Sequence, residues 1–367
     1  MKIAIDIRTA GGEKTGKGWY TFHIVQNLLR LDKKNSYILY SSYGIPGFEQ
    51  FKNAHLKLIK GKSIFWHRRV AKDVKKENVD LFFAPASYII PAILPKSIKK
   101  IITIHDLVAF LFPDTHNKKA VFIEKFYLKS SLRSADYVLT VSENTRRDVL
   151  KKFKYPEDKI EVVYCAASEN FKPLDKNSLL PFIKKTNLPA KFFLAVGTLS
   201  PRKNYENLLK AFAQIHQSFP EYNLIIVGDK GWDYDEIFKI IRESYLQKSV
   251  HLLGYLSEKS LVNLYNLARA LVFPSYYEGF GIPPLEAMKC GCPVIASCVS
   301  SIPEVMGDAA VLVNPDSTTE IAGAMTKLIK DSDLCEELKN LGLVRSTHFS
   351  WESSAQKLLD IINKMMS

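Results

Sequence analysis

A chain of 367 residues with 47% hydrophobic and 24% charged residues is typical of a folded globular protein, and its length favours two domains over one. The net charge of +13 favours phosphorylated small molecules, nucleic acid or an anionic lipid surface as partners, but no zinc-finger spacing or aromatic-rich RNA-binding signature supports nucleic acid. No apolar run approaches the roughly 20 residues that cross a bilayer, so we expect a cytoplasmic protein, with peripheral contact at the inner face of the cell membrane left open.

The first predicted element is a buried strand over residues 2–7, since Asp6 and Arg8 would interrupt the apolar core of a signal peptide. Further apolar, β-branched runs alternate with stretches of helical periodicity. They predict strands over 36–40, 81–84, 100–104 and 137–141, and helices over 20–31 and 142–153. This alternation predicts a parallel sheet covered by helices.

A second series of short apolar runs follows and predicts a second Rossmann-like domain. Its strands are expected over 192–196, 224–227, 250–253, 270–273, 293–296 and 310–313. Three prolines interrupt a lysine-rich stretch over 171–189, which places the boundary there. We predict domains over 1–175 and 176–348, and a terminal helix over 349–367 that begins at the N-cap Ser350.

The strongest chemical signal is the stretch that follows the strand ending at Phe273. Glycines at 279 and 281 flank Phe280 and let backbone N–H groups approach phosphate oxygens, and a helix is predicted to begin near Pro283. Glu278 precedes that helix and can reach a sugar. Glu286 lies two turns later, where it can accept hydrogen bonds from ribose hydroxyls or simply decorate a helix face.

This stretch, from Glu278 to Glu286, resembles the E-x7-E signature of the family 4 retaining glycosyltransferases, and the similarity extends over most of the chain, most strongly over 192–313. The resemblance implies an α/β protein of the GT-B fold, with two Rossmann-like domains facing across a cleft and a C-terminal helix crossing back to the N-terminal domain. It also implies a hexosyltransferase that uses a nucleotide-sugar donor. Glu278, Gly279, Phe280 and Gly281 would orient the sugar and phosphate, and Glu286 would bind the ribose.

A second motif, residues 196–204, again predicts a strand, a loop and a helix start. Arg202 and Lys203 are adjacent cations that could clamp a diphosphate leaving group or form a solvated basic cap. The motif resembles the phosphate-binding loop of the family, which implies donor contacts for Gly197, Arg202 and Lys203. Some members carry an arginine directly after the glycine; here Thr198 stands there, which leaves more of the charge to Arg202.

His105 and Asp106 directly follow the predicted strand 100–104. A histidine at a strand end is often structural, but the resemblance implies that His105 lies near the reacting sugar and its phosphate. Asp106 would orient the imidazole or meet the acceptor.

Two further segments complete the predicted site. Gly16 and Gly18 open the first helix and resemble the glycine-rich loop of the family on the acceptor or phosphate side, although Lys17 stands where the family usually has an apolar residue. Tyr255 and Leu256 follow the strand 250–253, where the resemblance places the nucleotide base.

No metal or other cofactor is expected. Asp233 and Asp235 spell the D-x-D motif of a different glycosyltransferase fold, but they stand at a predicted helix start, where capping explains them. Arg202 and Lys203 would supply the charge that a metal provides. The five cysteines form no familiar metal-ligand spacing.

Two stretches that mix lysine or arginine with aromatic residues, 60–76 and 118–133, account for much of the basic charge. An anionic membrane would attract such segments. Helices with one core face and one solvated basic face are the alternative explanation.

The sequence therefore predicts a retaining transferase that moves a hexose from a nucleotide-sugar to a glycan or lipid-linked acceptor in bacterial polysaccharide or lipopolysaccharide synthesis. His105, Arg202, Lys203 and Glu278 are the expected catalytic residues. GDP-mannose is the favoured donor, and UDP-glucose and UDP-N-acetylglucosamine stay open. A nucleotide-sugar epimerase of the same fold and a non-catalytic sugar-nucleotide-binding or membrane-scaffold protein are the rivals. The lack of G-x-G-x-x-G after the first strand disfavours a dehydrogenase.

Overall fold

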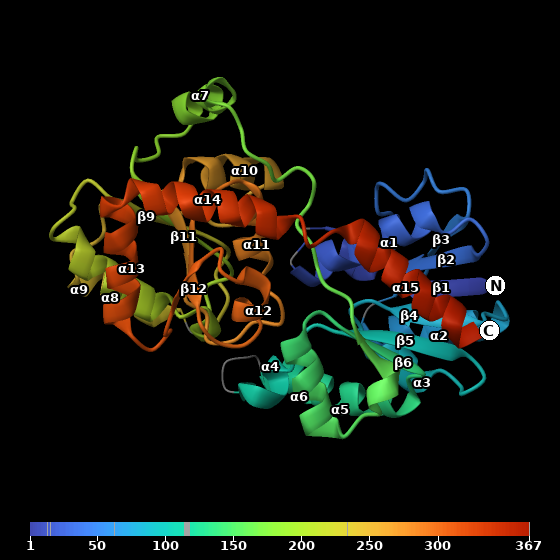
Figure 1. Ribbon diagram of the computed structural model, residues 1–367. Helices are drawn as coiled ribbons and strands as arrows, with labels where there is room; N and C mark the ends of the chain where they lie inside the picture. Colours follow the sequence, from blue (N-terminus) through green and yellow to red (C-terminus); the bar gives the residue numbers. More distant parts are fainter. Residues whose placement is uncertain (13, 15, 62, 114–117, 233, 367) are drawn as a thin grey trace. The chain divides into compact units, whose positions relative to one another are not determined.

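The computed structural model describes residues 1–12, 14, 16–61, 63–113, 118–232 and 234–366. It forms two compact units, which are described separately. Unit 1 comprises Met1–Cys165 and Ser350–Ser367, and unit 2 comprises Ala166–Phe349. Figure 1 shows that each unit is a sheet with helices around it.

Unit 1 is built on a parallel sheet that has seven strands among the described residues. The strand order is β3-β2-β1-β4-β5-β6-β7, so the order reverses between β1 and β4. Such a reversal is the switch point at which open parallel sheets bind ligands, beyond the carboxyl ends of the strands. The strands are β1 (Lys2–Asp6), β2 (Ser36–Ser41), β3 (Ala54–Leu58), β4 (Leu81–Ala84), β5 (Lys99–Ile104), β6 (Tyr137–Thr140) and β7 (Ile160–Val162).

Helices on both faces of this sheet explain why its central strands are apolar at nearly every position. The strand predictions match β1, β2, β4, β5 and β6, whereas β3 and β7 were missed: β3 is a half-exposed edge strand and β7 is very short. The helices of unit 1 are α1 (Gly16–Leu31), α2 (Ser63–Lys76), α3 (Ile89–Ile93), α4 (Val108–Leu111), α5 (Lys118–Ser134), α6 (Glu143–Phe153) and α15 (Trp351–Met366), with 3₁₀ turns at Arg8–Ala10 and Glu157–Lys159.

The C-terminal helix α15 returns to the N-terminal unit, as predicted, and lies against α1 in Figure 1. The Trp351 indole stacks on the His23 ring with centroids 5.3 Å apart. The Ser354 hydroxyl donates to the Tyr164 carbonyl at 2.7 Å. These contacts join the two ends of the chain in one core.

Unit 2 holds a second parallel sheet, with six strands among the described residues in the order β10-β9-β8-β11-β12-β13. Counted along the unit, this is the 3-2-1-4-5-6 order of nucleotide-binding sheets, with its switch point between β8 and β11. The strands are β8 (Phe192–Val196), β9 (Asn223–Val227), β10 (Val250–Leu252), β11 (Ala270–Phe273), β12 (Val294–Ser297) and β13 (Val311–Val313).

Several helices of unit 2 pack against the sheet and bury a continuous apolar core with it. They are α7 (Lys176–Lys185), α8 (Tyr205–His216), α9 (Asp235–Glu243), α10 (Glu258–Leu267), α11 (Ile282–Lys289), α12 (Ile302–Met306), α13 (Thr318–Lys330) and α14 (Ser332–Ser346), with a 3₁₀ turn at Pro201–Lys203.

The boundary between the units lies before residue 166 rather than at 175. The segment 166–175 belongs to unit 2 because hydrogen bonds hold it to α10. Asn170 donates to Glu258, the Leu174 amide donates to Asn266 at 2.7 Å, and Asn266 donates to the Lys172 carbonyl. The three prolines of the stretch 171–189 therefore lie within unit 2 and do not mark the division.

None of the helices in the described ranges is both long and apolar enough to cross a membrane.

Candidate active site

The loop after β8 begins with Gly197, whose φ of +149° is strained for a residue with a side chain. A Cβ here would lie 2.9 Å from Cε of Lys203. Glycine therefore allows the lysine side chain to pass directly over the backbone. The Tyr205 hydroxyl donates to the Gly197 carbonyl at 2.6 Å and secures the turn.

Arg202 and Lys203 lie on the 3₁₀ turn that precedes α8, and not in the first turn of the helix as the sequence suggested. Asn204 separates them from the helix in a left-handed conformation with φ of 59°. Its side-chain amide donates to the carbonyls of Pro274, at 3.0 Å, and Pro315, at 2.7 Å. Asn204 thus ties the cationic turn to the loop after β11, a role that sequence reasoning missed.

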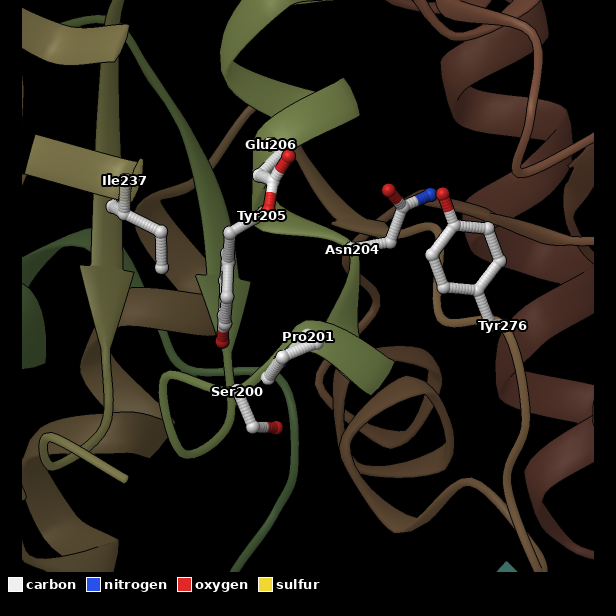
Figure 2. Close-up of a pocket in the computed structure, with 7 residues that line it drawn as sticks. All are labelled: Ser200, Pro201, Asn204, Tyr205, Glu206, Ile237 and Tyr276. Carbon is white, nitrogen blue, oxygen red and sulfur yellow. The ribbon is translucent and has the colours of Figure 1, made fainter. Parts of the chain in front are cut away.

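A small pocket of about 100 Å³ lies at the start of α8, and Figure 2 shows the side chains around it. The Tyr276 hydroxyl accepts a hydrogen bond from Asn207 at 3.1 Å. None of the predicted donor residues lines this pocket, which is formed by Ser200, Pro201, Asn204, Tyr205, Glu206, Ile237 and Tyr276.

The loops after β8 and β11 meet in an ion triad. Oε1 of Glu278 lies 2.7 Å from Nη1 of Arg202 and 2.8 Å from Nζ of Lys203. Arg202 also donates to the Tyr277 carbonyl, and the Lys203 ammonium lies 4.5 Å from the Phe273 ring centroid. The triad lies at the switch point of unit 2 and carries one net positive charge.

Burial by itself would raise the pKa of Glu278, which is 8% exposed, but the two cations outweigh it and lower that pKa to about 2. Burial lowers the pKa of Lys203, and Glu278 opposes the effect. The ion pairs of the triad therefore favour the ionised form of both Glu278 and Lys203.

Two serines that follow β12 hold the Glu278 loop from behind. The Glu278 amide donates to Oγ of Ser300 at 2.9 Å. Oγ of Ser301 lies 2.8 Å from the carbonyl oxygen of Glu278 and 3.0 Å from that of Phe280, and it donates its one proton between them. Gly281, with φ of +107°, then caps α11. The serines are far along the chain from this loop and no sequence motif indicated them.

Glu286 lies on α11 as predicted, and its Oε2 accepts a hydrogen bond from the Tyr265 hydroxyl at 3.0 Å. Burial raises the pKa of Glu286 to about 7, although Tyr265 partly opposes the shift. The carboxyl therefore titrates near neutral pH. Tyr265 on α10 was not singled out from the sequence.

The predicted base contact follows β10, where Gly254 has φ of +66°. The Tyr255 amide donates to Oδ1 of Asp229 at 3.1 Å, which joins this loop to the loop after β9. The Tyr255 side chain is exposed and Leu256 is half-buried.

In unit 1, Nε2 of His105 lies 2.7 Å from the Pro85 carbonyl oxygen, which can only accept, so this nitrogen carries the proton. The imidazole meets the Tyr20 ring edge-on, with centroids 4.8 Å apart. Burial and the Lys17 charge lower the pKa of His105 to about 4, so the ring is neutral at pH 7. Oδ1 of Asp106 accepts from the Val108 amide at 3.1 Å, at the start of α4.

Gly16 is the first residue of α1 and Gly18 lies in its first turn, so the glycines open the first helix as predicted, while Thr15 lies outside the described residues. A Cβ on Gly18 would approach the Thr9 carbonyl oxygen to 2.6 Å. Gly18 is thus explained by the packing of α1 against the preceding 3₁₀ turn.

Asp233 of the D-x-D sequence also lies outside the described residues. Asp235 is the first residue of α9 and not its cap, which is Tyr234. In the described part of the chain, no group of three or more histidine, cysteine or acidic residues could hold a metal ion.

Two parallel sheets with this strand order, and a cationic turn at the switch point of the second, define a protein of the nucleotide-binding α/β class. The model of the glycosyl transferases group 1 matches residues 178–343, and that of glycosyltransferase family 4 matches residues 19–170. O-antigen chain mannosyltransferase B of Escherichia coli is 33% identical over 306 residues, which are 83% of this chain and 79% of the relative. The chain belongs to this family of glycosyltransferases.

Two further relatives are also mannosyltransferases. The O-antigen chain mannosyltransferase RfbU of Salmonella typhimurium is 33% identical over 65% of this chain and 63% of its own length. The serotype-specific mannosyltransferase WbdA of Escherichia coli is 30% identical over 73% of this chain, which spans 34% of that protein.

Sucrose-phosphate synthase from Thermosynechococcus elongatus covers the whole chain and 99% of its own, with a TM-score of 0.81 and 20% identity. The lipopolysaccharide glycosyltransferase WaaG covers 98% of this chain and 99% of its own, with a TM-score of 0.77 and 16% identity. The fold is therefore GT-B, as expected.

Proposed function

We propose that the protein transfers a hexose from a nucleotide-sugar to a glycan or lipid-linked acceptor in the assembly of a bacterial surface polysaccharide. The observation that carries this proposal is the triad of Arg202, Lys203 and Glu278 at the switch point of unit 2. Mannose from GDP-mannose is the favoured donor, because three of the similar proteins are mannosyltransferases. UDP-glucose and UDP-N-acetylglucosamine are the alternatives; HepE of Anabaena, which shares the fold, was solved with UDP and glucose.

The triad suggests how donor binding and catalysis are coupled. The donor diphosphate would compete with Glu278 for the two cations, since it carries two negative charges against one and also makes charge-assisted hydrogen bonds. Arg202 and Lys203 would then stabilise the leaving diphosphate. Glu278, released from one or both cations, would accept hydrogen bonds from the sugar, and Glu286 from the ribose.

Transfer would retain the anomeric configuration, with the acceptor hydroxyl attacking from the face that the diphosphate leaves. His105 would lie near the reacting sugar and its phosphate as a neutral imidazole, since its pKa of about 4 keeps the ring uncharged at pH 7. We propose that no metal is needed, because Arg202 and Lys203 already supply two positive charges. Transfer that continues unchanged in EDTA is the expected result.

The donor site is tested by thermal unfolding with GDP-mannose, UDP-glucose and UDP-N-acetylglucosamine. A bound donor at a hundredfold excess over its Kd stabilises the folded protein by about 2.7 kcal/mol. Arg202→Met and Lys203→Met should lose this stabilisation, whereas Lys210→Met, an equal charge change at an exposed position on α8, should keep it. If no nucleotide-sugar stabilises the protein, the donor assignment is wrong.

Activity is tested by following donor turnover with and without a lipid-linked acceptor. A transferase needs the acceptor, whereas an epimerase releases free sugar without it. A protein that binds the donor but turns it over under neither condition would be the non-catalytic binding protein or scaffold.

We also propose that α5 makes peripheral contact with an anionic membrane. Phe122 and Phe126 on this helix are 72% and 61% exposed, Ile123 beside them is exposed, and Lys129 and Arg133 add positive charge. The one acid of the helix, Glu124, is half-buried. Exposed aromatic residues among basic ones are typical of segments that bind anionic lipid.

Sedimentation with phosphatidylglycerol vesicles is the test. Phe122→Ser together with Phe126→Ser should weaken binding, whereas Leu180→Ser, at an exposed apolar position on α7 of unit 2, should not. Equal binding to neutral phosphatidylcholine vesicles, or none to either, would contradict the proposal.

A further inference from the structure

Buried polar atoms without a hydrogen-bond partner gather at one edge of unit 1. Among the described residues, they include Oδ2 of Asp6 at the end of β1, the Tyr88 hydroxyl after β4, Oγ1 of Thr140 at the end of β6 and Oε1 of Glu124 on α5. The remaining ones are two tryptophan nitrogens in unit 1 and two serine hydroxyls in unit 2. Folded proteins pair almost all buried polar atoms, so a concentration of unpaired ones at the ligand-binding edge of a parallel sheet requires an explanation.

Tyr88 and Glu124 belong to one polar cluster with the turn that carries His105 and Asp106. The Tyr88 side chain is 6% exposed. Burial raises the pKa of its phenol well above the usual value, the charges of Glu124 and Asp106 raise it further, and a weak hydrogen-bond contact from the His105 backbone lowers it. The cluster therefore joins the ends of β4 and β5 to the first half of α5.

A hydrogen bond between α5 and the loop after β4 holds this cluster in place. The Ser131 hydroxyl of α5 donates to the Tyr88 carbonyl, which holds the loop after β4 against the helix. Burial raises the pKa of Glu124, Lys17 lowers it and Asp106 raises it. The fold thus buries one carboxyl oxygen, Oε1 of Glu124, and the Tyr88 hydroxyl, at a cost in stability, without a well-formed hydrogen bond to either atom.

The charges of the cluster restrict the ligand. Two carboxyl groups, Asp106 and Glu124, would repel a phosphate, and the nearby Lys17 charge would repel a metal ion. A sugar hydroxyl suits both unpaired atoms, because it can donate to Oε1 of Glu124 and accept from, or donate to, the Tyr88 hydroxyl.

We propose that Tyr88 and Glu124 bind hydroxyl groups of the acceptor sugar. The inference rests on the proposed transferase function and adds to it two specificity-determining residues. Glu124 would discriminate between acceptors, because an analogue that lacks the hydroxyl leaves the buried carboxyl unpaired.

The test compares Glu124→Gln and Tyr88→Phe with the wild-type protein and with Glu352→Gln, an exposed glutamate of the same unit. Wild-type transfer is first measured with GDP-mannose on a panel of octyl glycosides that includes octyl α-mannoside, and the best acceptor is used thereafter. Both variants should raise the acceptor KM by about tenfold or more. Donor-induced thermal stabilisation should stay at the wild-type level, and Glu352→Gln should leave both quantities unchanged.

Stability separates a binding role from a structural one. Oε1 of Glu124 is unpaired and the Tyr88 hydroxyl has only a weak contact with the His105 backbone, so the melting temperatures of Glu124→Gln and Tyr88→Phe without ligand should be close to or above that of the wild type. A fall in melting temperature with an unchanged acceptor KM would overturn the proposal. Deoxy analogues of the best acceptor complete the test: at least one should be discriminated less by Glu124→Gln than by the wild type, and equal discrimination of every analogue counts against the assignment.

Failure of the inference and failure of the proposed function can be told apart. If the wild type transfers sugar and both variants match it in acceptor KM, the assignment of Tyr88 and Glu124 is wrong while the function stands. If the wild type transfers to no member of the panel, the proposed function is contradicted and the inference falls with it.

Discussion

The switch points of the two sheets are prepared in opposite ways. In unit 2, Glu278 pairs with Arg202 and Lys203, and serines hold the loop that carries it. In unit 1, the Tyr88 hydroxyl and one oxygen of Glu124 are buried without partners. In the first region the charged side chains pair with one another until a ligand replaces one of them. The second lacks hydrogen bonds that only a ligand can supply, so the same substitution should have opposite effects on stability in the two regions.

The largest expected effect is that of Glu278→Gln on folding. It removes the negative charge that pairs with two mostly buried cations, whose side chains are 19% and 11% exposed, and breaking a buried ion pair costs about 3–5 kcal/mol. The free energy of unfolding in urea at pH 7 should fall by that amount, whereas Glu124→Gln should not lower it. Equal losses in both variants would remove the contrast between the two regions.

The next effect concerns pH. The pKa of Glu278 is lowered to about 2, so its stabilisation is complete above the unfolded value of 4.5 and is lost as the pH falls toward 2. The pKa of Glu286 is raised to about 7, so this carboxyl costs stability as the pH rises from 4.5 through 7. Glu286→Gln should therefore be more stable than the wild type by about 1–3 kcal/mol at pH 8.

That difference should largely vanish at pH 4, where Glu286 is protonated in the folded protein and mostly protonated in the unfolded chain. Urea titrations of both proteins across this range provide the measurement. A stability difference between the two proteins that stays constant with pH would mean that Glu286 does not titrate near neutrality.

A smaller effect is expected from the support of the Glu278 loop. Ser301→Ala removes the hydroxyl that hydrogen-bonds to the carbonyls of Glu278 and Phe280, which should cost about 1–3 kcal/mol and weaken donor binding. Ser218→Ala, at an exposed position after α8, should change stability by less than about 0.5 kcal/mol. Calorimetric melting with and without GDP-mannose tests both variants, and an unaltered Ser301→Ala would show that the loop keeps its shape without this serine.

The smallest effect compares two glycines of unit 2. Gly281→Ala forces a side chain into a left-handed conformation and to 2.8 Å from Cδ1 of Ile302, which should destabilise by about 1–2 kcal/mol. Gly323→Ala lies inside α13 with no heavy atom within 4 Å of the added Cβ and should stabilise by about 0.5–1 kcal/mol. Thermal melts of the two variants shifting in the same direction would contradict this geometry.

Sequence reasoning named the two loops of the proposed donor site because each is a local pattern of strand, glycine and charge. Gly197, Arg202 and Glu278 could be named without a structure for that reason. It missed Asn204, Ser300, Ser301 and Tyr265 as supports, because their partners lie elsewhere in the chain and hydroxyl or amide side chains are common in loops. The edge strand β3 was missed since its side chains alternate only weakly between buried and exposed.

Gly18 and Asp106 show a second kind of limit. Both stand in predicted ligand-binding segments, yet Gly18 makes room for the Thr9 carbonyl and Asp106 accepts from the Val108 amide. A residue that serves local packing and a residue that contacts a ligand look the same in the sequence. Only the packing around it separates the two.

By itself the sequence determined the α/β class and the two-sheet organisation, and it singled out the stretch from Glu278 to Glu286 as the centre of the proposed donor site, because hydrophobic periodicity and short motifs are local properties of a chain. The tertiary structure decided which charges meet. It paired Glu278 with the two cations expected to hold the diphosphate, and it buried Tyr88 and Glu124 without partners. Pairing and burial depend on residues brought together from distant strands, and no local pattern records them.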